Sequence, residues 1–438
     1  MEVREPSAKY LRSAGYVHTE LGVLPTDWRL TEIGQIAETS SGTTPPRSQY
    51  DRYFKGGVHA WVKTLDLNNA EILETDESVT DKAVEETSLR LFPEGSVLVA
   101  MYGGLRQIGR TGLLRLPAAV NQAITAIRPN PTTFCPEFLL FYLNHRVGHW
   151  QSVASSSRKD PNITGTDVRA FKLPLPEIDE QQKIAAALTD ADAMIDSLEQ
   201  LLTKKRQIKQ GAMQELLTGR RRLPGFTADW ATCELRQLGH VVRGVAYNPD
   251  ADLADGDTEQ AVRLLRSNNV QGGEIIRIGL QFVNRRRVRG DQYLQDGDLL
   301  LCMANGSRDL VGKAGRFVRA DEHSYTFGAF MSCFRPDPKA VESEFVAFLF
   351  QTHAFRQHVD LLLAGSSINN LRPEGVLGFT ASIPSEHSEQ VAIAQALSDM
   401  DAELTALESR LTKARALKQA MAQALLTGRI RLVEKIAS

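Results

Sequence analysis

Apolar residues recur at alternating steps of four and three along two stretches of the chain, residues 184–202 and 393–411. A repeat of about 3.5 residues puts these side chains on one stripe of a helix, which is the pattern of a coiled-coil seam. Both stretches continue to a Thr-Gly pair, where Gly219 and Gly428 suit the left-handed conformation that ends a helix. We therefore predict two helices near 177–219 and 387–429, each about 60 Å long.

The predicted seam consists of Ile184, Leu188, Ile195, Leu198, Leu202, Ile393, Leu397, Leu404, Leu407 and Leu411. Two unrelated amphipathic helices, each packed only on its own domain, would also carry apolar stripes. The similarity of the two seams favours the alternative in which the helices bury each other.

The chain repeats itself. Residues 180–223 align with residues 389–432 without a gap, at an offset of 209, and more than half of the aligned positions are identical. The repeat extends outward, because Asp27-Trp28 matches Asp229-Trp230 and the apolar run ending at Met101 matches the run ending at Met303. The chain is thus two copies of one plan, a globular part followed by a long helix.

This repeat predicts an α+β fold with two globular domains and two long antiparallel coiled-coil helices, related by a pseudo-two-fold axis. We place the domains at residues 1–175 and 223–385 and the helical segments at 176–222 and 386–438. Antiparallel helices would hold the two domains at opposite ends, facing one side. A duplex lying across them would be contacted at two separated half-sites, and these would differ because the two globular sequences differ.

Composition narrows the class of protein. The 438 residues are 42% hydrophobic and 24% charged, as in a soluble protein with a core, and the formal net charge is −2, so any DNA contact must come from local patches. The four cysteines are scattered and form no CxxC pair, which fits the reducing cytoplasm. The N-terminus does not resemble a secretory signal, and no apolar run is long enough for a membrane span.

Catalytic and metal motifs are not matched. Asn248-Pro249-Asp250 departs at its third position from the Asn/Asp-Pro-Pro-aromatic loop of adenine methyltransferases. Residues 306–314 have one residue too many for a phosphate-binding loop and lack its terminal hydroxyl. His145 and His149 have the helical spacing of two zinc ligands, but no third ligand accompanies them, which favours an ordinary helix face. We therefore expect no catalytic site, metal or cofactor in this chain.

Loops that follow matching strands carry side chains suited to base edges, because Arg pairs with guanine and Asn or Gln with adenine. Ordinary turn chemistry would account for many of them taken singly. The basic cluster at residues 284–289 fits either DNA contact or a solvated strand edge. The candidate DNA-binding residues are Tyr102, Arg106, Gln107, Asn121, Gln122, Ser157, Arg158, Lys159, Arg266, Asn268, Asn269, Arg285, Arg286, Arg287, Asn305, Ser307, Arg308, Ser366, Ser367, Asn369 and Asn370.

The segment from Tyr16 to Trp28 resembles the opening of type I restriction-modification specificity subunits, and residues 217–230 resemble their junction between the central helix and the second recognition domain. The Pro-x-Pro run before residues 180–184 is similar too, although Pro384 lacks the second proline of that pattern. The resemblance covers essentially the whole chain.

This resemblance implies two target recognition domains that read double-stranded DNA, with two methyltransferase subunits bound and two motor-nuclease restriction subunits as further partners. S-adenosylmethionine, ATP and Mg would then bind in those partners, where adenine is methylated and DNA is cut. The alternative from another class is a coiled-coil scaffold that binds protein rather than DNA.

Overall fold

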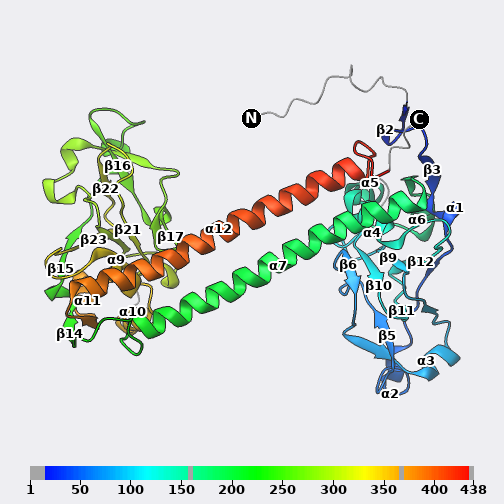
Figure 1. The fold of residues 1–438 in the computed structure, drawn as a ribbon, viewed down its shortest axis with the longest axis horizontal. Helices are drawn as coiled ribbons and strands as arrows, with labels where there is room; N and C mark the ends of the chain where they lie inside the picture. Colours follow the sequence, from blue (N-terminus) through cyan, green and yellow to red (C-terminus); the bar gives the residue numbers. More distant parts are fainter. Residues whose placement is uncertain (1–14, 156–160, 365–368, 434–438) are drawn as a thin grey trace. The chain divides into compact units, whose positions relative to one another are not determined.

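The computed structural model describes residues 15–155, 161–364 and 369–433. The chain divides into two compact units, one formed by residues 1–199 with 410–438 and the other by residues 200–409. The sequence-based division places whole helices between the globular parts, whereas this division assigns each long helix partly to both units. Figure 1 shows the two long helices, α7 (Ile178–Leu216) and α12 (His387–Leu425), each of 39 residues.

The globular part of the first unit contains two main sheets. One has the order β4 (Thr39–Ser41), β12 (Ile124–Ile127), β9 (Val97–Ala100), β10 (Thr111–Leu114) and β6 (Ala70–Ile72), and the other β7 (Glu77–Val79), β5 (His59–Val62), β11 (Ala118–Val120) and β8 (Leu91–Phe92). Two strand pairs are β1 (Tyr16–Thr19) with β2 (Gly22–Pro25) and β3 (Arg29–Glu32) with β13 (Lys172–Leu175). The helices are α1 (Ile33–Ile36), α2 (Tyr50–Tyr53), α3 (Asp81–Glu86), α4 (Pro136–His145), α5 (Val147–Ser155) and α6 (Gly165–Arg169), with the 3₁₀ turn η1 (Arg47–Gln49).

The second unit repeats this topology. Its larger sheet has the order β15 (Gly239–Arg243), β23 (Met331–Pro336), β20 (Leu299–Cys302), β21 (Ala314–Arg316), β18 (Glu274–Ile275) and β17 (Val270–Gln271), and its smaller sheet β19 (Gln281–Asn284), β16 (Ala261–Leu265) and β22 (Tyr325–Phe327). The terminal pair is β14 (Trp230–Glu234) with β24 (Thr380–Pro384), and the helices are α8 (Pro249–Asp252), α9 (Ser343–Leu349), α10 (His353–Leu363) and α11 (Pro373–Leu377). Short 3₁₀ turns are η2 (Leu235–Gln237), η3 (Ser267–Asn269), η4 (Arg285–Arg287), η5 (Gly290–Gln292) and η6 (Arg308–Leu310).

The matching sheets explain the matching apolar runs. β9 and β20 are each the central partner of two antiparallel strands, and all four residues of each strand are buried. A strand covered on both faces must be apolar throughout, so Val97–Ala100 and Leu299–Cys302 do not alternate with polar residues. Each domain also contains two parallel pairs, β5 with β11 and β6 with β10 in the first and β16 with β22 and β18 with β21 in the second.

The long helices run antiparallel within each unit. In the first unit Asp192 and Glu199 of α7 form ion pairs with Lys418 and Arg415 of α12, so the partner number falls as the α7 number rises. In the second unit Arg206 and Lys209 pair with Glu408 and Asp401, at 2.6 and 2.5 Å. The two sets are related by the 209-residue offset of the repeat.

The helix ends belong to the domain cores. In the first unit, Ile184 and Leu188 share a hydrophobic core with Leu425 and Leu426 and the residues around α4. In the second, Ile393 and Leu397 share one with Leu216 and Leu217. Of the ten seam positions, nine are at most 9% exposed and Leu404 is half-buried, so the 3.5-residue stripe is the buried face of both helices.

Candidate nucleic-acid interface

Three loops of the second unit meet beside Met303, the residue after β20. The Met303 amide donates to the carbonyl oxygen of Phe330, on the turn between β22 and β23, at 2.9 Å, and the Met303 carbonyl accepts from the Leu371 amide at 2.7 Å. Ala304 forms a β-bridge with Asn370. The Gly328 amide donates to the carbonyl of Leu265 at 3.0 Å, which brings the segment after β16 to the same place.

The first unit builds the same arrangement around Met101. The Met101 amide donates to the Ala123 carbonyl at 2.8 Å, and its carbonyl accepts from the Ile163 amide at 3.1 Å. The Asn121 amide donates to the Val62 carbonyl at 3.0 Å, as Gly328 does to Leu265. The fold therefore assembles, in each domain, loops that are far apart in sequence into one cluster.

Most of the candidate DNA-binding side chains belong to these loop clusters. Tyr102 and Arg106 are exposed on the loop after β9, Gln122 is exposed on the β11–β12 turn, and Ser307 and Arg308 are exposed after β20. Half-buried or exposed members of the same clusters are Gln107, Asn121, Arg266, Asn268, Asn305, Asn369 and Asn370. Ser157, Arg158, Lys159, Ser366 and Ser367 lie outside the described residues.

Some of these polar groups also stabilise their own turns. The Asn121 side-chain oxygen accepts from the Ala123 amide at 3.1 Å, and the Asn305 oxygen accepts from the Ser307 amide at 3.0 Å. The Asn369 amide donates to the Gly306 carbonyl at 3.2 Å, and the Arg308 guanidinium donates to the Asp360 carbonyl at 2.8 Å. These contacts hold the loops in one conformation and leave part of each side chain for a ligand.

Asn269 differs from its neighbours because it is 0% exposed. Its side-chain oxygen accepts from the Arg266 amide at 3.0 Å, and its amide donates to the carbonyls of Ile276 and Ile278 at 2.9 and 3.0 Å. With both ends of the amide occupied and no exposed surface, Asn269 shapes the loop and offers nothing to a base.

We expect Asn269→Ala to lower the free energy of unfolding by about 1–3 kcal/mol, because the loop loses the three hydrogen bonds that this buried side chain makes. Urea denaturation of the variant measures this loss, with the exposed Asn268→Ala as the matched control, expected within about 0.5 kcal/mol of the parent chain. Equal stability of the two variants would contradict the structural role.

The arginine cluster 285–287 lies away from the loop cluster. β16 and β19 pair antiparallel with Ala261 opposite Asn284, so Arg285 follows the end of β19 beside the start of β16, whereas Arg266 follows the end of β16. β16 has five residues, which separates the two positions by about 16 Å. All three arginines, including Arg286, are exposed at this end of β16. Arg287 forms an ion pair with Asp252 at 2.9 Å.

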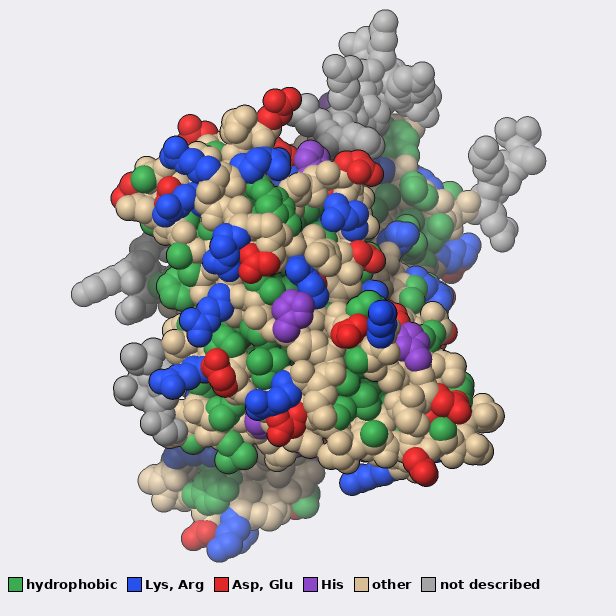
Figure 2. Space-filling view, turned by 90° about the vertical axis from the view of Figure 1, so that its left-hand side faces the viewer, with side chains coloured by type: hydrophobic (Ala, Val, Ile, Leu, Met, Phe, Trp, Pro, Cys, Tyr) green, Lys and Arg blue, Asp and Glu red, His purple; other side chains and the backbone are tan. Residues whose placement is uncertain are grey.

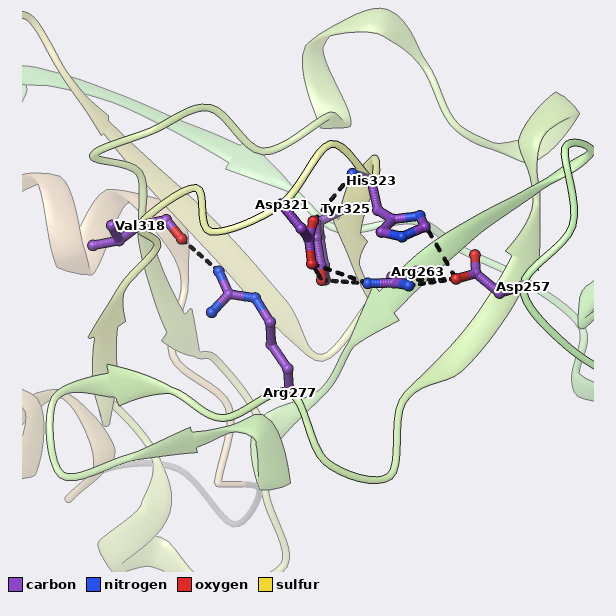
Figure 3. Close-up of polar contacts among 7 residues, drawn as sticks. All are labelled: Asp257, Arg263, Arg277, Val318, Asp321, His323 and Tyr325. Carbon is purple, nitrogen blue, oxygen red and sulfur yellow. Dashed lines mark hydrogen bonds and ion pairs between the residues drawn. The ribbon is translucent and has the colours of Figure 1, made fainter.

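Other arginines of the second unit serve the fold. In Figure 3, Arg263 of β16 donates to Asp257 at 2.9 Å, to Asp321 at 3.1 Å and to the Tyr325 hydroxyl at 2.8 Å. Arg277 lies over the Phe317 and Tyr325 rings and donates to the Val318 carbonyl. On the face shown in Figure 2, Lys and Arg side chains are dispersed among acidic and apolar ones rather than gathered in one basic patch.

Sequence reasoning missed two parts of these clusters. Residues 63–66 follow β5 as residues 266–269 follow β16, and Asp66 accepts from the Lys63 amide at 2.7 Å just as Asn269 accepts from that of Arg266. Phe330 is 72% exposed on the turn that corresponds to residues 121–123. The position of residues 63–66 after a strand could have indicated their part in the cluster. Phe330 could not be predicted, because an apolar side chain by itself does not indicate contact with a base.

A second repeated set of contacts joins each domain to the helices. In the first unit Arg431 donates to both carboxylate oxygens of Glu180, at 2.7 and 2.8 Å. It also donates to both carboxylate oxygens of Asp27, at 2.9 and 2.7 Å. The Trp28 indole donates to Glu180 at 3.0 Å. Glu180 is 2% exposed. The hydrogen bonds from Arg431 hold the pKa of Asp27 below its usual value. We call Asp27, Trp28, Glu180 and Arg431 the first junction.

The second junction uses the residues at the repeat offset. Arg222 donates to both oxygens of Glu389, at 2.5 and 2.7 Å, and its guanidinium lies over the Trp230 ring. The glutamines after the two glutamates also match, since Gln181 donates to the Pro176 carbonyl at 2.8 Å and Gln390 to that of Pro384 at 2.9 Å. The repeated sequence thus encodes a repeated attachment of domain to helix pair.

Metal sites and membrane-spanning helices can be looked for only among residues 15–155, 161–364 and 369–433. The described residues contain no group of three His, Cys, Asp or Glu placed to hold a metal ion. His149 lies edge-on to Trp150 and Phe171, and burial lowers the pKa of both His145 and His149. The described helices include none with the length and apolarity that crossing a bilayer requires.

The chain is similar to known proteins over both halves. The family model described as "Type I restriction modification DNA specificity domain" matches residues 25–210 and 227–414. The MjaIX specificity subunit of Methanocaldococcus jannaschii is 28% identical over 192 residues, 43% of either chain, and the Escherichia coli EcoR124I/EcoR124II specificity subunit is 23% identical over 42% of this chain and 45% of its own. The chain thus spans less than half the length of these two relatives. The alignment with the M. jannaschii MjaVIII specificity subunit is 22% identical and covers 93% of this chain and 94% of the relative.

Solved structures share the fold. The type I restriction-modification S subunit from M. genitalium has a TM-score of 0.55 at 12% identity, covering 91% of this chain and 96% of its own. A chain from a structure titled for complex assembly and conformational transition of the type I R-M system has a TM-score of 0.56 at 14% identity, covering 93% and 99%. The fold is therefore α+β, with two globular domains of one plan and two long antiparallel helices. Because the family model matches most of the chain, once in each half, the chain belongs to the family of type I restriction-modification DNA specificity subunits.

Proposed function

We propose that this chain is the non-catalytic DNA-reading subunit of a type I restriction-modification complex and that it binds a bipartite, asymmetric site in double-stranded DNA. The observation that carries this proposal is the pair of loop clusters around Met101 and Met303, which share their hydrogen bonds but not their side chains. A common backbone frame with different polar side chains presents different donors and acceptors to base edges. Each cluster reads one half-site.

The helix pair supports the partner proposal. Its two halves are identical at more than half of their aligned positions and carry matching ion pairs, so two copies of one partner meet two similar surfaces. These partners are two methyltransferase subunits, which bind S-adenosylmethionine and flip the target adenine, and two restriction subunits with ATP and Mg complete the nuclease. The complex works in the cytoplasm.

We expect the length of the helices to set the gap between the two half-sites. A helix of 39 residues is about 58 Å long. Two domains that read the same face of B-DNA have half-site centres about 10 base pairs apart, which leaves an unread gap of about six or seven base pairs.

Methylation mapping tests this function. DNA from cells that express the chain with its methyltransferase subunit is sequenced for modified adenine, and a split, non-palindromic motif with a fixed gap is expected. Exchange of residues 223–385 for the second domain of another family member is expected to change one half-site completely and leave the other intact. A continuous or palindromic motif, or an exchange that alters both halves, would overturn the proposal.

A further inference from the structure

The turn between β22 and β23 carries a large apolar side chain in water. Phe330 is 72% exposed, whereas the three residues before the turn, Tyr325, Thr326 and Phe327, are buried. An isolated exposed apolar residue needs no explanation in itself. Phe330 differs from other exposed apolar residues because its backbone is hydrogen-bonded within the loop cluster around Met303.

That backbone is fixed from three sides. The Phe330 carbonyl accepts from the amides of Met303 and Ala304, at 2.9 and 3.2 Å. On the same turn the Gly328 amide donates to Leu265 at 3.0 Å, and the Met331 amide donates back to Gly328 at 2.8 Å. Gly328 also forms a β-bridge with Val245. These bonds therefore fix the turn, and the ring lies on its exposed side.

The loops around the turn indicate which chemical group the Phe330 ring would contact. Two of its anchors, Ala304 and Leu265, directly precede Asn305 and Arg266, and Ala304 also forms a β-bridge with Asn370. Loops with polar side chains suited to base edges therefore adjoin the turn that carries the ring. In the major groove the one apolar group on a base edge is the C5-methyl of thymine, and Phe is among the side chains that contact it. A protein partner would instead bury a broader apolar area with few polar groups at its centre.

We infer that Phe330 is a specificity-determining residue that contacts the methyl group of a thymine in the half-site read by the second domain. This inference rests on the proposed function. The first domain lacks the feature, because the matching carbonyl belongs to Ala123, beside the exposed Gln122. The two domains thus differ in an apolar contact as well as in polar ones.

The test uses the full chain assembled with its methyltransferase subunits and DNA duplexes carrying the mapped site. Each thymine of the second half-site, on either strand, is replaced in turn by uracil, which pairs identically but lacks the methyl group. For the parent complex one replacement is expected to weaken binding about four-fold, the effect of one buried methyl. The Phe330→Ala complex is expected to bind the thymine duplex roughly ten-fold more weakly and to be indifferent to that uracil.

Controls separate this inference from other outcomes. Val318→Ala, which truncates another exposed apolar residue of the same domain, is expected to leave binding and uracil sensitivity unchanged. Parent-like binding by Phe330→Ala, unchanged uracil sensitivity in that variant, or a half-site without thymine would each overturn the inference. So would loss of the methyltransferase subunits from the Phe330→Ala complex, since this would assign the ring to a protein contact. If the parent complex bound no bipartite site at all, the proposed function itself would fail.

Discussion

Replacement of Arg431 by alanine is expected to lower the free energy of unfolding of the first unit by about 3 kcal/mol or more, because it leaves a buried carboxylate without its cation. Arg431 lies six residues beyond Leu425, the last residue of α12, and its guanidinium donates four hydrogen bonds to Glu180 and Asp27. Glu180 is 2% exposed, so water cannot replace the lost partner. The Trp28 indole would remain as a neutral donor to Glu180.

The unit in which stability is lost can be observed directly. Hydrogen exchange measured by mass spectrometry reports opening of β3 and β13 in the first unit separately from β14 and β24 in the second. Faster exchange is expected in the first pair alone. The matched control is Arg429→Ala, which removes an exposed arginine from the same segment and is expected to change stability by no more than about 0.5 kcal/mol.

A double-mutant cycle identifies the cause. If Arg431 acts through Glu180, then Glu180→Gln in the Arg431→Ala background should restore part of the lost stability, because the buried charge disappears. An Arg431→Ala chain as stable as the Arg429→Ala chain would mean that the first junction contributes little to the fold.

The sequence predicted the periodic elements well, and the reason is that their signal is local. The seam recurs every three or four residues, so Ile184 to Leu202 could be recognised without knowing what covers them. The internal repeat likewise predicted two globular parts of one plan, since Trp28 and Trp230 have matching neighbours, and the matching sheets confirm that plan.

The junctions and loop clusters could not be predicted in the same way. Arg431 and Glu180 are 251 positions apart, and nothing in the local pattern of either indicates an ion pair. Asn269 looks as suitable for adenine as Asn268 does, and only the strand geometry shows that one is buried and the other exposed. Residues 285–287 form the densest basic run, but the β16–β19 register places them at the opposite end of the strand from Arg266.

Simultaneous replacement of Leu198 and Leu407 by lysine is expected to abolish assembly with the methyltransferase subunits. Both leucines are 6% exposed on the stripe that the helix pair buries, one in each unit, and an unpaired ammonium there costs several kcal/mol. Each helix pair should separate or repack locally, which removes the matched surfaces on which two identical partners dock.

Native mass spectrometry of the copurified complex measures the stoichiometry, and circular dichroism measures the helix content. The control carries the same charges on the exposed face as Ser197→Lys with Ser409→Lys, and it should keep the helix content of the parent chain. A Leu198→Lys, Leu407→Lys chain that still bound two methyltransferase subunits would refute the dependence of assembly on this seam.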